Sequence, residues 1–194
     1  MPRHREFDPD KLLNTAILLF WEKGYFDTSV DELVKRSGVA KYGIYGVFGP
    51  KRDLFKSVLG QYARDRHRDI QSPIRKEQAS LPDVLAFFSS LPPKLTTKGF
   101  QYGCLMVNTG IEIGTRDAEL SEIVKAFFDE TVETMKDCLD RAVSLGQLPA
   151  SINTRTMAKY LVTEFRACLM LAASGHTKSD LKQHLNLSLK VLQP

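Results

Sequence analysis

Apolar residues recur three and four positions apart along most of the chain, the spacing that places side chains on one face of an α-helix. The longest such series lies in the segment 117–145, and its members follow a near-heptad spacing: Leu120, Ile123, Val124, Phe127, Phe128, Val132, Met135, Leu139, Ala142 and Val143. Glycine, proline and capping residues divide the other series into shorter helices. The pattern predicts an all-α fold of about nine helices.

The first helix is predicted to begin at Asp8 or Asp10, either of which can serve as its N-cap. Lys23-Gly24 should end it, because a cation favours the negative end of a helix and glycine tolerates the backbone of a helix exit. Four residues form its predicted buried stripe and two more lie at the edges: Leu13, Ala16, Ile17 and Phe20, then Leu12 and Trp21.

The stretch from Thr28 to Asp53 predicts two short helices joined by a tight turn. Thr28 and Ser29 are N-cap candidates, and Ser29 with Glu32 fits the S-x-x-E capping box of a helix start. Gly38 should end this helix, because glycine readily adopts the left-handed conformation of a tight exit. The arrangement is that of a helix-turn-helix.

The second of these two helices presents chemistry that suits DNA. Its apolar side chains, Ile44, Val47 and Phe48, are predicted to face the core, which leaves Lys41, Tyr42 and Tyr45 facing outward. A cation and two phenols can reach base edges and phosphates in a DNA major groove. The alternative is a solvated helix face on which a tyrosine ring covers apolar neighbours.

Several spaced motifs resemble the DNA-binding domain of TetR-type (tetracycline repressor family) regulators. They are LLFWEKGY at 18–25, T-S-V-x-E-L-V at 28–34, S-G-V-A-K at 37–41 and I-Y-x-x-F-x-x-K-x-x-L at 44–54. The resemblance implies an N-terminal helix-turn-helix domain, residues 6–66, that binds a double-stranded DNA operator. It also implies a C-terminal helical domain for effector binding and dimerisation, residues 80–194.

The resemblance also implies which residues contact DNA: Thr28, Ser29, Lys41, Tyr42, Gly43, Tyr45 and Lys51. Thr28 and Lys51 should lie at helix N-termini, where backbone N–H groups favour a phosphate oxygen. The sequence departs from the family where Tyr42 replaces a small residue, and where Gly46 and Val47 stand in place of an aromatic residue or histidine. The operator therefore need not resemble that of a better-matched relative.

A polar segment from Ser72 to Ser80 marks the predicted domain boundary, after a fourth helix over 51–71. Ser80 should cap a helix over 81–91 that stops at Pro92-Pro93, because proline lacks the N–H that continues a helix. The remaining helices are predicted at 103–113, 117–145, 154–174 and 178–192.

Apolar residues cover most of the circumference of the helix at 154–174. The apolar stripe of the helix at 178–192 is also wider than contact with a single core requires. Both helices should therefore be buried on two sides. Two such helices from each of two copies would form a four-helix bundle, the arrangement of a TetR-type homodimer. The alternative is that both are interior helices of a monomer.

Ten residues of the second domain are candidates for binding an apolar or aromatic small-molecule effector: Phe87, Phe88, Tyr102, Cys104, Asn108, Glu112, Phe127, Phe128, Glu164 and Phe165. The aromatic members would serve equally as core, and the polar members as buried hydrogen-bond partners. If Glu164 faces a pocket, it favours a cationic or hydrogen-bond-donating ligand. Cys104, near a helix start, is either a reactive thiol that senses oxidants or electrophiles, or an inert buried one.

Composition adds modest support to this interpretation. The formal net charge is +4, and residues 1–76 hold 15 Lys and Arg against 10 Asp and Glu, so the basic excess lies with the helix-turn-helix. Three distant cysteines indicate neither disulfides nor a zinc site, and we expect no metal and no cofactor. The longest apolar run has seven residues, Ala167 to Ala173, so we expect a cytoplasmic protein with no membrane span.

These observations favour a sequence-specific transcriptional regulator: a homodimeric repressor of a palindromic operator, released by a ligand. The rival from another class is a TetR-folded factor that organises DNA or binds proteins and has no inducer. We expect no enzyme, because His4, His67, His176 and His184 lie in polar or terminal contexts without a nearby nucleophile at a catalytic spacing.

Overall fold

Nine α-helices make up the described part of the chain, residues 7–192, in the computed structural model. Their bounds are α1 Pro9–Lys23, α2 Val30–Ser37, α3 Lys41–Phe48, α4 Lys51–Asp69, α5 Leu81–Leu95, α6 Leu105–Ile113, α7 Ala118–Ser144, α8 Thr154–Ala173 and α9 Lys178–Ser188. Three short 3-10 helices complete it: η1 Lys98–Phe100, η2 Gly114–Arg116 and η3 Leu189–Leu192. No β-strand occurs between residues 7 and 192, so the predicted all-α fold is confirmed.

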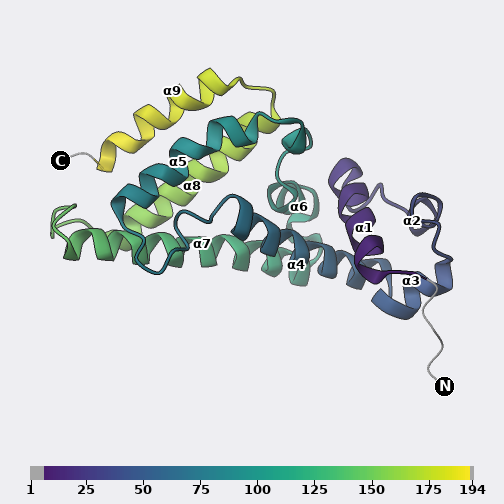
Figure 1. Cartoon of the computed structure of the whole chain (residues 1–194). Helices are drawn as coiled ribbons and strands as arrows, with labels where there is room; N and C mark the ends of the chain where they lie inside the picture. The colour runs from purple at the N-terminus through teal and green to yellow at the C-terminus, as the bar shows by residue number, and fades with distance from the viewer. Residues whose placement is uncertain (1–6, 193–194) are drawn as a thin grey trace.

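Helices α1, α2 and α3 form a small group at one end of α4, and α4 extends from them along the larger group of C-terminal helices (Figure 1). Asp8 is the N-cap of α1 and accepts a hydrogen bond from the N–H of Asp10. Pro50 is the N-cap residue of α4. The predicted start of the N-terminal domain, at residue 6, and the predicted end of the C-terminal domain, at residue 194, lie outside the described residues.

The buried face of α1 is rotated relative to the predicted stripe. Leu12 is 2% exposed and Leu19 is 3% exposed, whereas Leu13 is only half-buried. Because α1 packs against α2 as well as α4, its buried face spans two neighbours and is wider than a single stripe. The assignment of Leu13 to the core and of Leu12 to its edge was therefore wrong.

The predicted stop of α5 at Pro92-Pro93 was also wrong, because the helix continues to Leu95. Two prolines deprive the helix of two backbone donors, which is costly in isolation. Leu91 and Leu95 lie on either side of them and are 0% and 2% exposed. Their burial in the core stabilises the last turn and outweighs the lost hydrogen bonds.

The C-terminal helices pack around the long pair α7 and α8, with α5 and α9 on one side and α6 toward the N-terminal group (Figure 1). Asp117 caps α7 by accepting hydrogen bonds from the N–H groups of Glu119 and Leu120, both at 3.1 Å. The last predicted helix, 178–192, is divided into α9 and η3 after Ser188. Between residues 7 and 192 no helix is both long enough and apolar enough to span a membrane.

Candidate DNA-binding surface and regulatory core

Helices α2 and α3 form a helix-turn-helix whose geometry follows from local sequence. The Ser29 hydroxyl accepts a hydrogen bond from the N–H of Glu32 at 3.1 Å, and the Glu32 carboxylate accepts one from the N–H of Ser29 at 3.2 Å. The predicted capping box is therefore present. Gly38 ends α2 with a φ of 72°, in the left-handed region that glycine tolerates best.

Helix α3 separates an apolar face from a polar one. Ile44 is 1% exposed and packs into the core, whereas Tyr42 and Tyr45 are 71% and 43% exposed. Lys41 is also exposed, at the first position of the helix. The separation agrees with the predicted orientation for Ile44, whereas Val47 and Phe48, also predicted to face the core, are only half-buried. It leaves a cation and two phenols available on one helix.

Gly43 lies close to the side chains of Phe7 and Val39. A Cβ atom at this position would lie 3.0 Å from Cε1 of Phe7 and 3.3 Å from Cγ1 of Val39. Such distances are shorter than ordinary van der Waals contact, so an alanine at this position would require the Phe7 ring and the Val39 side chain to shift by a few tenths of an ångström.

The Lys41 ammonium group has a partner within the protein. Its Nζ donates to Oδ1 of Asp31 at 2.9 Å, and Asp31 lies in the first turn of α2. This hydrogen bond raises the pKa of Lys41. The sequence analysis did not identify Asp31. If Lys41 contacts a DNA phosphate, that phosphate must either displace the Asp31 carboxylate from the lysine or bind against its repulsion.

We expect Asp31→Asn to tighten binding to any DNA duplex by about twofold to fivefold, because the substitution removes a competitor for Lys41 and a charge that repels phosphate. Non-specific and operator duplexes should gain alike, measured by fluorescence anisotropy at several salt concentrations. Asp129→Asn is the matched control, because Asp129 is also an exposed carboxylate paired with a lysine, 3.0 Å from Lys125 on α7. Equal affinities for the parent and the Asp31→Asn variant would show that the pair does not restrain Lys41.

Thr28 and Lys51 are less available to DNA than their positions in the sequence indicate. Thr28 is 2% exposed and its hydroxyl donates to the carbonyl of Gly24 at 2.7 Å. The Lys51 ammonium donates to the carbonyl of Phe26 at 3.3 Å and lies 4.5 Å from the centroid of the Tyr25 ring. Partial burial lowers the pKa of Lys51. Both side chains therefore stabilise the turn between α1 and α2.

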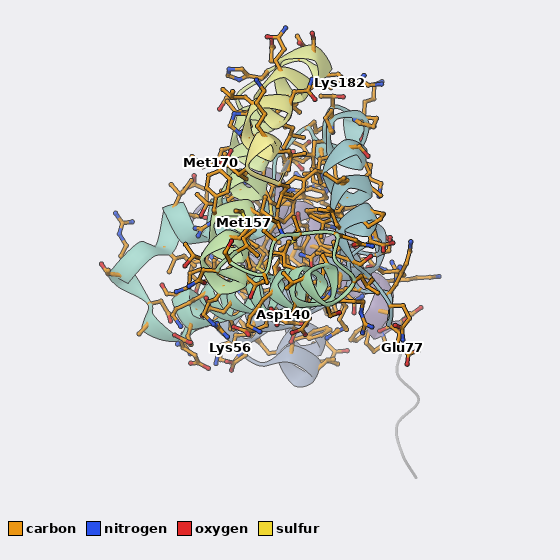
Figure 2. All side chains as sticks on the ribbon, turned by 90° about the vertical axis from the view of Figure 1, so that its left-hand side faces the viewer. Lys56, Glu77, Asp140, Met157, Met170 and Lys182 are labelled. Atoms are coloured by element: carbon orange, nitrogen blue, oxygen red, sulfur yellow. The ribbon has the colours of Figure 1, made fainter. Side chains whose placement is uncertain are left out.

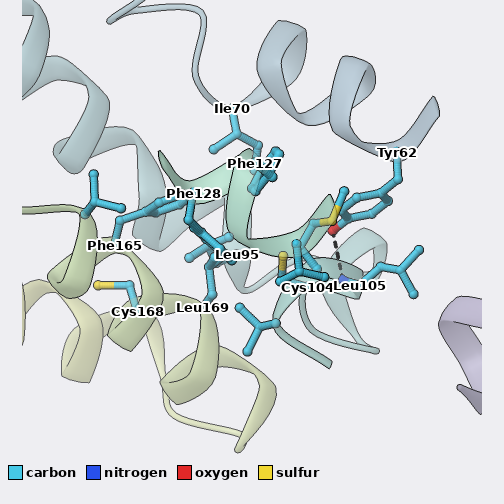
Figure 3. Close-up of a cluster of buried hydrophobic side chains, with 14 of the residues drawn as sticks. Tyr62, Ile70, Leu95, Cys104, Leu105, Phe127, Phe128, Phe165, Cys168 and Leu169 are labelled. Carbon is cyan, nitrogen blue, oxygen red and sulfur yellow. Dashed lines mark hydrogen bonds between the residues drawn. The ribbon is translucent and has the colours of Figure 1, made fainter. Parts of the chain in front are cut away.

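The five phenylalanines among the effector candidates are buried together in the C-terminal helices. Phe87 and Phe88 are 0% exposed, and Phe127, Phe128 and Phe165 are at most 5% exposed. The ring centroids of Phe87 and Phe165 are 5.1 Å apart, as are those of Phe127 and Phe128, in edge-to-face geometry. Figure 3 shows Phe127, Phe128 and Phe165 together with Leu95 and Leu169. Neighbouring side chains therefore occupy the ring faces that a ligand would contact.

The polar effector candidates have partners within the protein. The Asn108 amide donates to the carbonyl of Tyr102 at 2.7 Å. Glu164 accepts from the Ser188 hydroxyl at 2.5 Å and lies 2.8 Å from Nε2 of His184, so it joins α8 to α9. Glu112 accepts hydrogen bonds from the turn between α1 and α2. Tyr102, Asn108 and Glu112 also line an open hollow of 400 Å³ beside α1.

Cys104 is the N-cap residue of α6 and is 3% exposed. Burial raises the pKa of its thiol, which is the opposite of the lowering that a reactive thiolate requires. Figure 3 places it beside Leu105, whose N–H donates to the Tyr62 hydroxyl at 3.2 Å. In this conformation the geometry favours an inert thiol.

The sequence analysis also did not predict a charged contact between α4 and the start of α7. The Arg52 guanidinium donates two hydrogen bonds to the Asp117 carboxylate, at 2.7 and 2.9 Å. These bonds and those from the first turn of α7 lower the pKa of Asp117 to about 2. Glu119 pairs with both Arg52 and Lys56 of α4. Arg52 and Asp117 are 65 positions apart in the sequence, so no local pattern indicates that they pair.

The fold and the exposed face of α3 define a helix-turn-helix DNA-binding protein. The sequence model for bacterial regulatory proteins of the tetR family matches residues 12–58. The model described as tetracyclin repressor-like, C-terminal domain, matches residues 80–185, more than half of the chain. The chain therefore belongs to the TetR family of transcriptional regulators, as its motifs predicted.

Individual relatives are similar over nearly their whole length. The HTH-type transcriptional repressor ComR of Escherichia coli K12 is 25% identical over 190 residues, which cover 97% of this chain and 90% of ComR. DhaR of Mycobacterium sp. GP1, also an HTH-type transcriptional repressor, is 23% identical over 187 residues, covering 94% and 91%. A cysteine mutant of the TetR family regulator CifR, complexed with 26-bp operator DNA, superposes with a TM-score of 0.88 at 21% identity, covering 99% of this chain and all of CifR.

Proposed function

We propose that this TetR-family regulator is a homodimeric repressor that binds a palindromic operator and leaves it when a small molecule binds. The observation that carries the proposal is the exposed face of α3, which presents Lys41, Tyr42 and Tyr45 on a helix-turn-helix. ComR and DhaR are repressors by name, and CifR is bound to operator DNA. A regulator of this kind would act in the cytoplasm on double-stranded DNA.

Within this proposal the DNA contacts divide into two classes. The side chains of Lys41, Tyr42 and Tyr45 would contact bases and the adjacent backbone, because they project furthest from α3. Ser29 at the start of α2 and the backbone at Gly43 would position the domain against phosphates. Thr28 and Lys51 would contribute indirectly, by ordering the turn that precedes α2.

Exposed apolar side chains on α8, α9 and η3 support the homodimer. Met170 is 50% exposed, Leu187 68%, Val191 45% and Tyr160 37%. Figure 2 labels Met157 and Met170 on α8, of which Met170 is exposed and Met157 is half-buried against the core. Apolar surface on two adjacent helices favours burial against a second copy, and two helices from each subunit would form a four-helix bundle.

Release by a ligand would require the aromatic core to open. Ring-to-ring packing of Phe87 with Phe165, and of Phe127 with Phe128, occupies the interior. An apolar or aromatic ligand would therefore select a minor conformation in which these rings have separated. It would shift the protein away from the DNA-binding form only by its differential affinity for the two forms.

The packed core also favours a second candidate function, a TetR-folded factor that organises DNA or binds other proteins without an inducer. In that case the aromatic cluster is simply core, and its close packing needs no ligand. Binding to many dispersed sequences would distinguish this candidate from an operator-specific repressor.

Selection of bound duplexes from a random pool tests both candidates. The dimeric repressor should enrich a palindrome whose half-site centres lie about one helical turn apart, or a multiple of it, because each α3 enters its own major groove. The salt concentration must be stated, since phosphate contacts make the affinity steeply salt-dependent. A single half-site would contradict the dimer, and no enriched sequence would favour the DNA-organising factor.

A further inference from the structure

The Glu112 carboxylate, on α6, bonds to the backbone of the turn between α1 and α2. Its Oε2 accepts from the N–H of Tyr25 at 2.8 Å, and its Oε1 accepts from the N–H of Phe26 at 2.7 Å. Both oxygens are therefore engaged, in short charge-assisted bonds across 86 and 87 positions of the sequence. The turn presents its N–H groups to one carboxylate from another part of the fold.

Gly24 permits this close approach. A Cβ atom there would lie 2.6 Å from Oε2 of Glu112, and the residue has a φ of 84°, which L side chains rarely adopt. Glycine at this position therefore serves both the exit of α1 and the contact with α6. Gly24 and the Glu112 carboxylate together form a contact between the N-terminal group of helices and the C-terminal group.

The turn held by Glu112 leads directly into α2. Thr28 donates to the carbonyl of Gly24, and the next residue is the N-cap of α2, so the turn determines where α2 begins. Lys51 contacts the same turn from α4, and the Arg116 guanidinium lies 5.5 Å from the centroid of the Phe26 ring. Because α2 packs against α3, a shift of this turn would carry the recognition helix with it.

We propose that Glu112 is a positioning residue for DNA binding, which sets the angle of α2 and α3 relative to the C-terminal helices. In the dimer this angle fixes the separation of the two recognition helices, so the proposal rests on the proposed operator-binding function. Glu112 acts without touching DNA, because both of its oxygens are occupied and a carboxylate repels phosphate. This role differs from the predicted one, in which Glu112 contacts an effector.

The test compares Glu112→Ala and Glu112→Gln with the parent on the selected palindrome and on a duplex of unrelated sequence. Glu112→Ala should weaken palindrome binding about tenfold, and Glu112→Gln, which retains one acceptor oxygen, should weaken it less. Affinity for the unrelated duplex should be unchanged, and so should the slope of log affinity against log salt, because no phosphate contact is lost. Glu122→Ala is the control, since it removes an exposed carboxylate from α7.

Stoichiometric titration of the active fraction separates positioning from a merely structural role. If Glu112 only stabilises the fold, the active fraction falls while the dissociation constant of the remaining protein stays at the parent value, and the proposal is overturned. Should Glu112→Ala fold poorly, the near-isosteric Glu112→Gln decides by the same criterion. Failure of the parent to select any palindrome would remove the proposed function, whereas a binding parent and variants within twofold of it would remove this inference alone.

Discussion

Operator binding should weaken about tenfold or more when Lys41 is replaced by alanine, and by a similar factor in Tyr45→Ala. Both side chains project from the exposed face of α3, and neither is needed to hold that helix, since Ile44 provides its buried contact. In the proposed dimer each substitution removes two contacts. The double variant should therefore lose about a hundredfold or more in affinity if the two contacts act independently.

The two variants should differ in their response to salt. Lys41→Ala removes a cation, so the slope of log affinity against log salt should fall by about one per subunit. Tyr45→Ala removes no charge, and its slope should match that of the parent. Fluorescence anisotropy over a salt series measures both, and circular dichroism checks the fold. Lys182→Ala, an exposed lysine on α9, is the control. Parent-like affinity in the folded double variant would exclude α3 as the recognition helix.

The second large effect is expected from charge on the exposed apolar surface of α8 and α9. Met170→Asp with Leu187→Asp should convert the dimer to monomers, because two carboxylates in each subunit would be buried without partners at the centre of the proposed bundle. The monomer then binds each half-site separately. Operator affinity should fall about a hundredfold or more, because the second half-site no longer binds at high effective concentration.

Analytical ultracentrifugation and operator titration together test this expectation. Since Met170 and Leu187 are 50% and 68% exposed in the single chain, the substitutions should leave each folded subunit intact. Leu85→Asp serves as the control, because Leu85 is a 42% exposed apolar residue on α5. A double variant that sediments as a dimer would show that the subunits associate through another surface. A parent that sediments as a monomer would contradict the homodimer altogether.

Local sequence was sufficient to predict the helix-turn-helix. The capping box of Ser29 and Glu32, the left-handed Gly38 and the apolar spacing around Ile44 all depend on residues within a few positions of one another. Helix ends and helix faces are determined by short segments of the chain, so these features can be predicted without knowledge of the tertiary structure. The same reasoning predicted the extent of α7 and α8 to within one residue at each end, because their boundaries coincide with capping residues.

Other features depend on contacts between distant segments. Helix α5 continues through Pro92 and Pro93 because core burial of Leu91 and Leu95 outweighs an unfavourable local preference. Three residues predicted to bind external partners also make internal contacts: Thr28, Lys51 and Glu112. These side chains can form hydrogen bonds within the protein or with a partner, and the positions of neighbouring groups in the fold determine which internal bonds form.

The amino-acid sequence by itself determined the order of the helices, the exposed polar face of α3 and membership of the TetR family, because periodicity, caps and motifs are local properties. The tertiary structure decided which polar groups remain available to partners. It placed Glu112 against the backbone of Tyr25 and Phe26, and Asp31 against Lys41, because hydrogen bonds between segments depend on the packing of whole helices. The physical reason is that a buried or paired polar group is satisfied wherever the fold brings a donor to an acceptor, at any separation along the chain.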